Sequence, residues 1–304
     1  MGRSSIMGTS SILSSLQDAM HRSADALAGV MPWVLAIAVI FTVAALWPGQ
    51  RCNADRPWWR NCGLVTDACY CFLMPLFAPY VRIGLLSAGA TVIVLVIGGQ
   101  RPDEYLLNGG GILGRLGFPG QLAVYVILSD FLLYWSHRLF HGSQLWRYHA
   151  VHHSATDVDW TTAYRSHPVN LWCGPVLVTT AMILLGIAPV VLAFWTPFDM
   201  LMAAFVHANL KWTLGPLKYV VASPVFHRWH HTYEACEKNY GSSLALWDVM
   251  FGTFFMPPGC LPVRYGVADG SVPEGFLLQL AYPFRAASSG DANAAAQRPT
   301  GAKA

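Results

Sequence analysis

The chain has 304 residues, of which 54% are hydrophobic and 12% are charged, and its mean hydropathy is +0.40. This composition excludes an ordinary soluble domain and indicates an integral membrane protein. The formal net charge of +3 comes without a basic run, which argues against a nucleic-acid partner. The seven cysteines lack zinc-ribbon or ferredoxin spacing, which predicts reduced thiols.

The first third of the chain contains two apolar segments. Residues 1–30 are Ser-rich, lack the features of a secretory signal, and are expected to form an N-terminal tail. The segment 31–47 is uncharged and nearly all apolar, which gives about 25 Å of helix and predicts a first span. Residues 61–99 are also apolar but too long for one straight crossing. Pro75 and Pro79 favour either a kink or a hairpin, and the sequence leaves both open.

A glycine-rich stretch follows, with a GxGxxG match at Gly109, Gly111 and Gly114. No β-branched strand precedes this match, so a flexible loop is favoured over a nucleotide-binding turn. The apolar segment 121–136 is the next predicted span. We therefore expect residues 31–136 to form the transmembrane helices of this part of the chain.

The rest of the chain is predicted to return repeatedly to one membrane surface. Residues 171–205 are apolar but interrupted by one glycine and two prolines, so we expect a hairpin of two short helices. Lys and Arg residues in 137–170 and 207–284 predict that these segments face the cytosol. Residues 285–304 are too polar to form a core, so we expect a disordered tail. The predicted fold class is all-α: polytopic membrane helices with a cytosolic histidine-rich helical cap.

Ten of the eleven histidines lie between His137 and His231. Eight of them form three groups with spacings of three and four, which place the imidazoles of each group on one helix face. The groups are His137 and His141; His149, His152 and His153; and His227, His230 and His231. A single histidine usually packs and hydrogen-bonds inside a protein. Three groups interleaved with aromatic residues instead predict packed helices that enclose a metal centre.

The number of histidines is sufficient for two metal ions. Iron, copper, nickel and zinc all accept nitrogen ligands, and their order of affinity does not select among them. Two redox metals beside a membrane suggest oxygen activation, because the C–H bonds of a lipid chain have no acidic or basic group on which acid–base catalysis could act. A zinc hydrolase would carry an HExxH-like helix, which the chain lacks. The main alternative is a membrane metal-binding protein or transporter without oxygenase activity, although a transporter would place its ligands within the spans.

The stretch from Leu122 to Phe255 resembles the fatty acid hydroxylase and sterol desaturase superfamily of integral-membrane di-iron enzymes. The resemblance rests on SDFLLYWSHRLFH, LWRYHAVHHS, HANLKW, SPVFHRWHH and NYGSSLALWDVMFGTFF. It implies a catalytic region at 137–284 with two iron ions, molecular oxygen, a lipid substrate and an external electron donor. Such an enzyme would hydroxylate or desaturate a sterol, a fatty acyl chain or another lipid. The implied ligands are His137, His141, His149, His152, His153, His227, His230 and His231, with His207 as a ninth.

Supporting groups are expected to fix the tautomers of these imidazoles. We expect Asp130, Glu234 and Asn239 to have this role at the catalytic site. Asp157, Asp159, Asp248, Tyr164 and Arg165 are further candidates, with solvated loop charge as the alternative for the acids.

Two residues, His167 and Asn170, do not fit the pattern of the histidine groups and of the superfamily. His167 precedes Pro168, which keeps it out of helical geometry, so we expect His167 to support activity without binding metal. Many relatives in the superfamily carry an acid near the position of Asn170, and the amide here leaves the role of this loop open.

Electrons must come from another protein. Reducing oxygen to water takes four electrons and a C–H substrate supplies two, while the chain shows no iron–sulfur spacing and no haem-attachment motif. We therefore expect a ferredoxin- or cytochrome-type donor that docks on the cytosolic face. The basic residues predicted to attract it are Arg147, Lys211, Lys218 and Arg228.

Overall fold

A computed structural model describes residues 4–47, 49–52, 57–97, 105, 108–142 and 144–285. The tail expected at 285–304 lies outside these residues except for Arg285. The described part of the chain is helical, and its only β pairing is one isolated bridge between Thr232 and Tyr265. The all-α prediction is confirmed.

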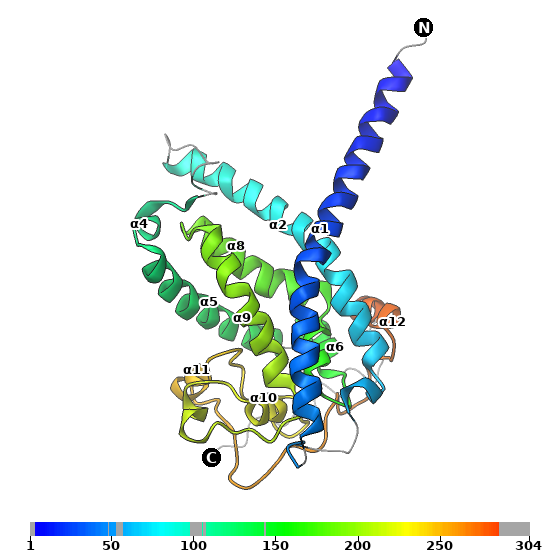
Figure 1. Cartoon of the computed structure of the whole chain (residues 1–304), viewed down its shortest axis with the longest axis vertical. Helices are drawn as coiled ribbons and strands as arrows, with labels where there is room; N and C mark the ends of the chain where they lie inside the picture. Colours follow the sequence, from blue (N-terminus) through cyan, green and yellow to red (C-terminus); the bar gives the residue numbers. More distant parts are fainter. Residues whose placement is uncertain are drawn as a thin grey trace.

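Among the described residues, four helices are long and apolar enough to cross a membrane: α1 (Ser4–Leu46), α2 (Leu64–Ile97), α5 (Phe118–Phe140) and α9 (Pro189–His207). Within α1 the apolar part is Leu27–Leu46, close to the predicted span. Residues 4–30, expected as a tail, are helical and continuous with this span, and the N-terminal half of α1 projects away from the other helices (Figure 1).

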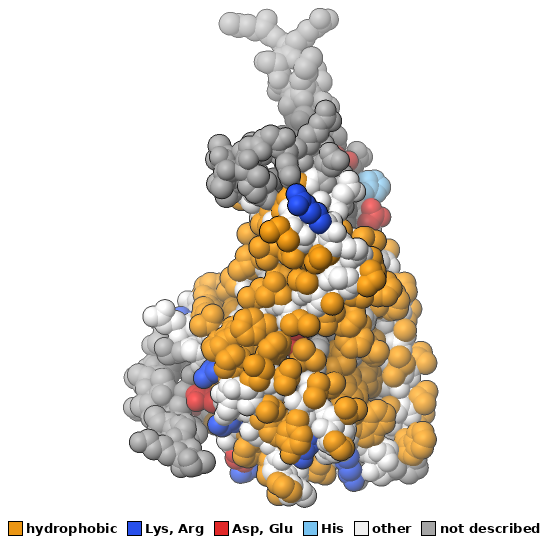
Figure 2. All heavy atoms as spheres, turned by 90° about the vertical axis from the view of Figure 1, so that its left-hand side faces the viewer, with side chains coloured by type: hydrophobic (Ala, Val, Ile, Leu, Met, Phe, Trp, Pro, Cys, Tyr) orange, Lys and Arg blue, Asp and Glu red, His pale blue; other side chains and the backbone are white. Residues whose placement is uncertain are grey.

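The lipid-facing character of the helices is visible on the surface. Figure 2 shows a face on which hydrophobic side chains cover most of the area, while Lys and Arg side chains gather mainly along its lower margin. The lower end of the molecule also carries α6 (Trp146–His153) and α10 (Pro224–His230), which bear histidines (Figure 1). The basic residues and the histidines therefore share one end of the bundle.

The long apolar segment after the first span is a single helix. α2 continues through both Pro75 and Pro79 for 34 residues, so the hairpin alternative for 61–99 is wrong. Proline removes one backbone hydrogen bond and bends a helix without necessarily ending it.

The apolar segment 171–205 does form two helices. The first combines α7 (Pro168–Leu171), a π-helical turn η3 (Trp172–Val176) and α8 (Leu177–Leu184), and the second is α9. They meet at Gly186, whose φ of +102° favours glycine. The Gly110 N–H donates to the Gly186 carbonyl at 3.0 Å, and a Cβ on Gly186 would lie only 2.0 Å from the Gly110 oxygen. The glycine-rich stretch, including α4 (Gly111–Gly114), thus allows a close backbone contact.

Short elements complete the histidine-bearing end: η1 (Trp58–Arg60), η2 (Trp160–Tyr164), η4 (Gly215–Tyr219), α11 (Leu246–Met250), α12 (Phe276–Ala281) and η5 (Tyr282–Phe284). Two apolar clusters join this end to the spans. Trp160 packs with Ile37 and Phe41 of α1, and Val151 of α6 packs with Tyr70 of α2. The histidine-bearing elements are therefore anchored on the membrane helices.

Candidate metal centre

Nine histidines lie at or near the ends of four helices. α5 carries His137 and ends next to His141, α9 ends at His207, and α6 and α10 supply the other six, including His231 directly after α10. The start of α10 is fixed locally, because Ser223 accepts a hydrogen bond from the Phe226 N–H and Pro224 occupies the first helical position.

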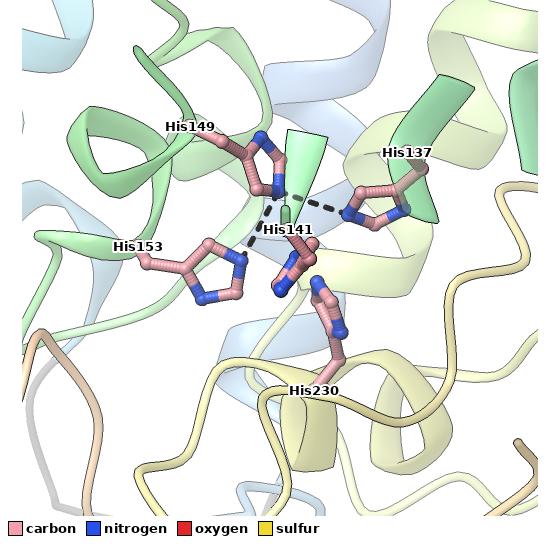
Figure 3. A group of neighbouring side chains, drawn as sticks. All are labelled: His137, His141, His149, His153 and His230. Atoms are coloured by element: carbon pink, nitrogen blue, oxygen red, sulfur yellow. Dashed lines mark hydrogen bonds between the residues drawn. The ribbon is translucent and has the colours of Figure 1, made fainter. Parts of the chain in front are cut away.

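These side chains form two groups. The five-histidine group contains His137, His141, His149, His153 and His230, shown in Figure 3. The four-histidine group contains His152, His207, His227 and His231. Within each group the potential ligand atoms all lie within 4.8 Å of one another, and every imidazole except that of the half-buried His137 is buried. The structure therefore brings together all nine histidines singled out in the sequence.

Helix geometry decides which histidine joins which group. His149 and His153, four positions apart on α6, enter the five-histidine group, while the intervening His152 enters the four-histidine group. α10 does the reverse, with His227 and His231 in one group and His230 in the other. Successive residues of a helix diverge by about 100°, so adjacent histidines must point to different places. Each HxxHH sequence consequently contributes to both histidine groups.

Oxygen acceptors fix the tautomers of five imidazoles. In each case Nδ1 lies 2.6–2.9 Å from an oxygen that only accepts, so Nδ1 carries the proton and Nε2 keeps its lone pair. The pairs are His137 with Tyr240 O, His149 with Asn170 Oδ1, His152 with Arg165 O, His207 with Ala203 O, and His230 with Lys238 O.

The resulting lone pairs face one another. The Nε2 atoms of His137 and His149 are 2.9 Å apart, and those of His152 and His207 are 3.2 Å apart. Each of these four rings carries its proton on Nδ1, so neither pair has a proton between its Nε2 atoms. These contacts are repulsive unless a cation lies between them. The Nε2 atom of His230 is also buried without a hydrogen-bond partner among the described residues. Both donor sets therefore fit a divalent transition metal.

Burial also keeps the imidazoles outside the spans neutral. Desolvation lowers the pKa of His149, His152 and His153 well below the usual value, and neighbouring imidazoles lower it further. The same causes lower the pKa of His230 and His231. Neutral imidazole is the form that binds metal, so the chain holds these side chains ready for an ion at neutral pH.

The NYG sequence shapes a loop that serves two histidines. The buried Asn239 has a left-handed φ of +59° and lies between the two residues whose carbonyls accept from His230 and His137. Its side chain donates to the carbonyls of Phe226 and Phe255 at 2.7 and 2.6 Å. Asn239 thus positions both imidazoles through the backbone of the loop and contacts neither directly.

Asp248 holds the other side of this loop. Its carboxylate accepts from the N–H groups of Tyr240 and Gly241 at 2.8 and 2.7 Å. A Cβ on Gly241 would lie 2.4 Å from the Leu244 carbonyl oxygen, which explains the glycine. Asp248 therefore fixes the Tyr240 carbonyl that orients His137.

The two acids expected to fix imidazoles lie elsewhere. Asp130 accepts from the backbone N–H groups of Ser243 and Leu244 and from the Trp247 indole, so it anchors the loop before α11. Glu234 forms an exposed ion pair with Arg264. Among the contacts of the described residues, neither acid reaches an imidazole of the two groups.

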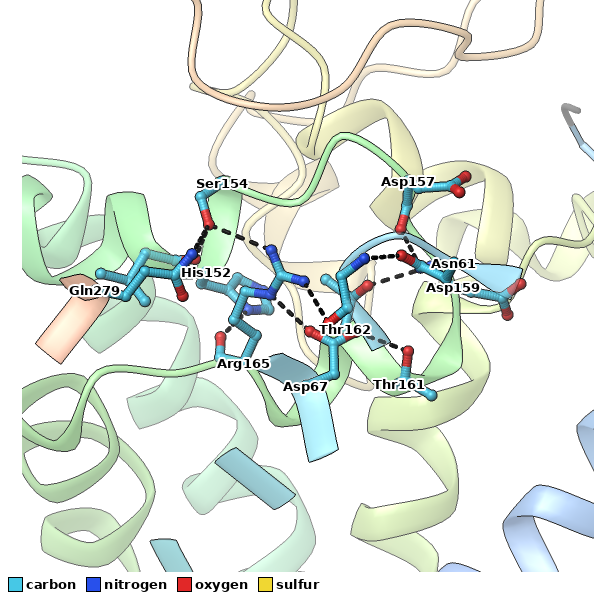
Figure 4. Close-up of polar contacts among 12 residues, drawn as sticks. Asn61, Asp67, His152, Ser154, Asp157, Asp159, Thr161, Thr162, Arg165 and Gln279 are labelled. Atoms are coloured by element: carbon cyan, nitrogen blue, oxygen red, sulfur yellow. Dashed lines mark hydrogen bonds and ion pairs between the residues drawn. The ribbon is translucent and has the colours of Figure 1, made fainter. Parts of the chain in front are cut away.

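Arg165, a candidate from the sequence, supports His152 through its carbonyl, and it is held by a buried ion pair with Asp67, which was not among those candidates. Asp67 on α2 binds Arg165 at 2.6 Å, and the Arg165 carbonyl accepts from His152 Nδ1 at 2.9 Å (Figure 4). The signal in the sequence was an acid inside an otherwise apolar segment, which usually marks a function. A Cβ on Gly63 would lie 2.0 Å from Arg165 Nη2, so a larger residue at this position would displace the guanidinium.

Asn170 and His167 belong to one short element. His167 lies outside both groups, where its Nδ1 accepts from the Val169 N–H and its Nε2 donates to the Leu280 carbonyl. It therefore caps α7, which carries the Asn170 side chain to His149 at 2.7 Å. The amide thus has a defined partner, and the expected metal retention after loss of His167 stays a prediction.

The donor-docking prediction is wrong for Arg228. Its side chain is 0% exposed and donates to the carbonyls of Val158 and His207 and to the Tyr265 hydroxyl. A buried guanidinium cannot attract a protein partner. Lys211 is exposed, and Lys218 and Arg147 are half-buried, so these three stay candidates.

Comparisons with known proteins find a matching family model and several related enzymes. Residues 122–253 match the family model described as fatty acid hydroxylase. The ornithine lipid hydroxylase OlsE of Rhizobium tropici is 35% identical over 54% of this chain and 50% of its own. The alkylglycerol monooxygenase of Homo sapiens is 34% identical over 41% of this chain and 28% of its own, and the methylsterol monooxygenase 2-2 of Arabidopsis thaliana is 29% identical over 44% and 52%. The chain thus spans about half or less of these relatives, and no solved structure matches it significantly.

Proposed function

Since residues 122–253 match the fatty acid hydroxylase family model, we propose that the chain is a membrane-bound di-iron oxidoreductase that uses O2 to hydroxylate or desaturate a lipid. The observation that carries this proposal is the pair of adjacent imidazole groups whose unprotonated Nε2 atoms face one another. Hydroxylation is favoured over desaturation because these relatives are named as hydroxylases and monooxygenases.

Each group would hold one iron ion. The five-histidine group and the four-histidine group offer nitrogen donors only, and bound iron would supply the activation of oxygen. The chain itself contributes three things. Hydrogen-bond acceptors at Nδ1 keep the Nε2 lone pairs of the imidazoles pointing into each group, burial excludes water, and the membrane helices present the site to lipid. Asn239 and Asp248 contribute to the first of these through the carbonyl of Tyr240.

The lipid substrate would carry a polar head. The matched relatives are named for an ornithine lipid, an alkylglycerol and a methylsterol, all of which combine a long apolar part with a polar group. The two histidine groups lie where α5 and α9 end, at the same end of the bundle as most of the exposed basic residues (Figures 1 and 2). By the positive-inside bias we assign this end to the cytosol.

An external donor would supply the electrons. The donor proposed is a ferredoxin- or cytochrome-type protein that docks near the exposed Lys211 and the half-buried Lys218. The alternative of a metal transporter gains no support, because both histidine groups lie at helix ends and no chain of ligands continues into the described spans.

The test combines metal content with product formation. The protein is purified without oxygen, its iron is quantified, and the reduced protein is mixed with O2 and a lipid extract that is then analysed by mass spectrometry. We expect two iron ions per chain and a lipid product whose mass has increased by one oxygen or decreased by two hydrogens. His149→Ala and His227→Ala should each abolish the product. One ion per chain in the active protein, or full activity with zinc alone, contradicts the di-iron proposal.

A further inference from the structure

A cavity of about 620 Å³ lies beside the metal centre. Its walls come from the start of α2, the loop after α6 and the segment that leads into α12. Ligand sites in proteins commonly measure about 300–1,000 Å³, so the cavity is large enough for a small polar molecule or a lipid head group. Ser154 forms part of its wall and directly follows His153, so one peptide unit joins the cavity to the five-histidine group.

The lining of this cavity is mainly polar. Asn61, Thr66, Ser154, Asp157, Glu274 and Gln279 all contribute to it. An acyl chain would leave these groups without hydrogen bonds, which costs free energy for each buried polar atom. The lining therefore suits a polar group and disfavours a lipid tail.

The charge of the lining is negative. Arg165 also faces the cavity, but its guanidinium already donates to Asp67, Ser154 and the Gly63 carbonyl (Figure 4). The carboxylates of Asp157 and Glu274 form no ion pair within the described part of the chain. A bound group should therefore supply positive charge or hydrogen-bond donors.

Gln279 offers a buried acceptor that lacks a donor. Its side chain is 2% exposed, and its Nε2 donates to Ser154 Oγ and to the Pro273 carbonyl, both at 3.1 Å. Its Oε1 is buried and accepts no hydrogen bond from the described residues. An unsatisfied buried oxygen costs about 1–3 kcal/mol, so its persistence in the cavity wall points to a ligand that donates to it.

The cavity also lies at the level of lipid head groups. Thr66 is in the first turn of α2, and the span Leu64–Gly89 starts there. Lipid head groups occupy the polar layer just outside the hydrocarbon core of the bilayer. A lipid whose tail lies along the spans can therefore place its head group in the cavity.

From these observations we propose that the cavity binds the polar head group of the lipid substrate, and that it selects head groups with ammonium or hydroxyl donors over anionic ones. The identification of the bound lipid as the substrate rests on the proposed function. The binding and its selectivity do not, because they require neither iron nor turnover.

Cys62 provides a natural reporter for the test. It lines the cavity and its side chain is exposed, while the exposed Cys260 lies outside the cavity and serves as the internal control. The full chain in detergent is treated with a maleimide under nitrogen without reductant, and labelling rates of both cysteines are measured by mass spectrometry. The probes are hexadecylamine, hexadecylglycerol and heptadecanoate, which have sixteen-carbon tails and different heads.

We expect the amine and the glycerol ether to slow labelling of Cys62 about tenfold at a concentration ten times their Kd, by simple occupancy. Heptadecanoate should change the labelling rate of Cys62 by less than about twofold, and Cys260 should be labelled at the same rate in the presence of each of the three amphiphiles. A single partly exposed ion pair contributes little to affinity, so both acids are changed together. The double variant Asp157→Asn/Glu274→Gln should lower the affinity for the amine about tenfold and the affinity for the glycerol ether less than about threefold. Glu237→Gln, an exposed acid outside the cavity, should change neither.

Three results would overturn the proposal. They are equal protection by all three amphiphiles, which would indicate a tail effect, no protection by any of them, and equal protection of Cys260. Protection of Cys62 with the expected selectivity in a protein that forms no oxidised lipid would uphold the head-group site and contradict the proposed function instead.

Discussion

Asn170 should control metal binding in the five-histidine group. Its side-chain oxygen accepts from His149 Nδ1 at 2.7 Å, whereas the other four oriented imidazoles donate to backbone carbonyls. His149 is also central to its group, because its Nε2 lies 2.9 Å from that of His137 and 3.2 Å from that of His153. One side-chain substitution can therefore release the imidazole on which the others converge.

The change we propose is Asn170→Leu, which keeps a similar volume and removes the acceptor. His149 then either leaves a buried N–H unpaired, at about 1–3 kcal/mol, or moves its proton to Nε2 and loses the metal-binding lone pair. At about 1.4 kcal/mol per tenfold change, metal affinity at this group should fall roughly 5- to 150-fold. This range overlaps the loss of about 10- to 100-fold typical when the partner of a metal-bound histidine is removed.

The assay is competition with a chelator under nitrogen, followed by iron quantification per chain. We expect the wild-type chain to retain two ions and Asn170→Leu to approach one, since the four-histidine group keeps its own acceptors from Arg165 and Ala203. Asn170→Asp, which keeps the acceptor, is the matched control and should retain both ions. If Asn170→Leu holds two ions with unchanged affinity, the side chain does not set the tautomer of His149 and the reasoning fails.

Three further outcomes are expected. His207→Ala should release the ion of the four-histidine group, whereas His167→Ala should keep most of the metal and lose activity; the opposite pattern of iron contents would refute the assignment. Gly63→Ala should lower the free energy of unfolding by about 1–3 kcal/mol because its Cβ would collide with Arg165, while Gly84→Ala meets nothing within 4 Å and should not, as thermal unfolding of both variants will show. The chemically reduced protein, freed of reductant and given O2 and substrate, should form at most one product per di-iron site until a donor is restored; sustained turnover from NADH or NADPH alone would disprove the need for an external donor.

Much of this protein follows from its sequence because the relevant signals are local. The length of each apolar run predicts the first and third spans and the broken segment that forms α8 and α9. Spacings of three and four place the histidines on helices, and the same nine residues form the two groups in the structure. Helical periodicity and hydrophobicity act over a few turns of chain, so neither needs the tertiary fold to be recognised.

Tertiary structure alone decided how the histidines are divided and held. His137 meets the carbonyl of Tyr240 across 103 positions, and Asp67 reaches Arg165 across 98. Backbone carbonyls that orient imidazoles have no signature in the sequence, because every residue has one and only the fold determines which of them lies beside a given ring. The burial of Arg228, which excludes it from a docking surface, also depends on carbonyls brought from distant segments. Local chemistry thus selected the ligands, and long-range packing selected their partners.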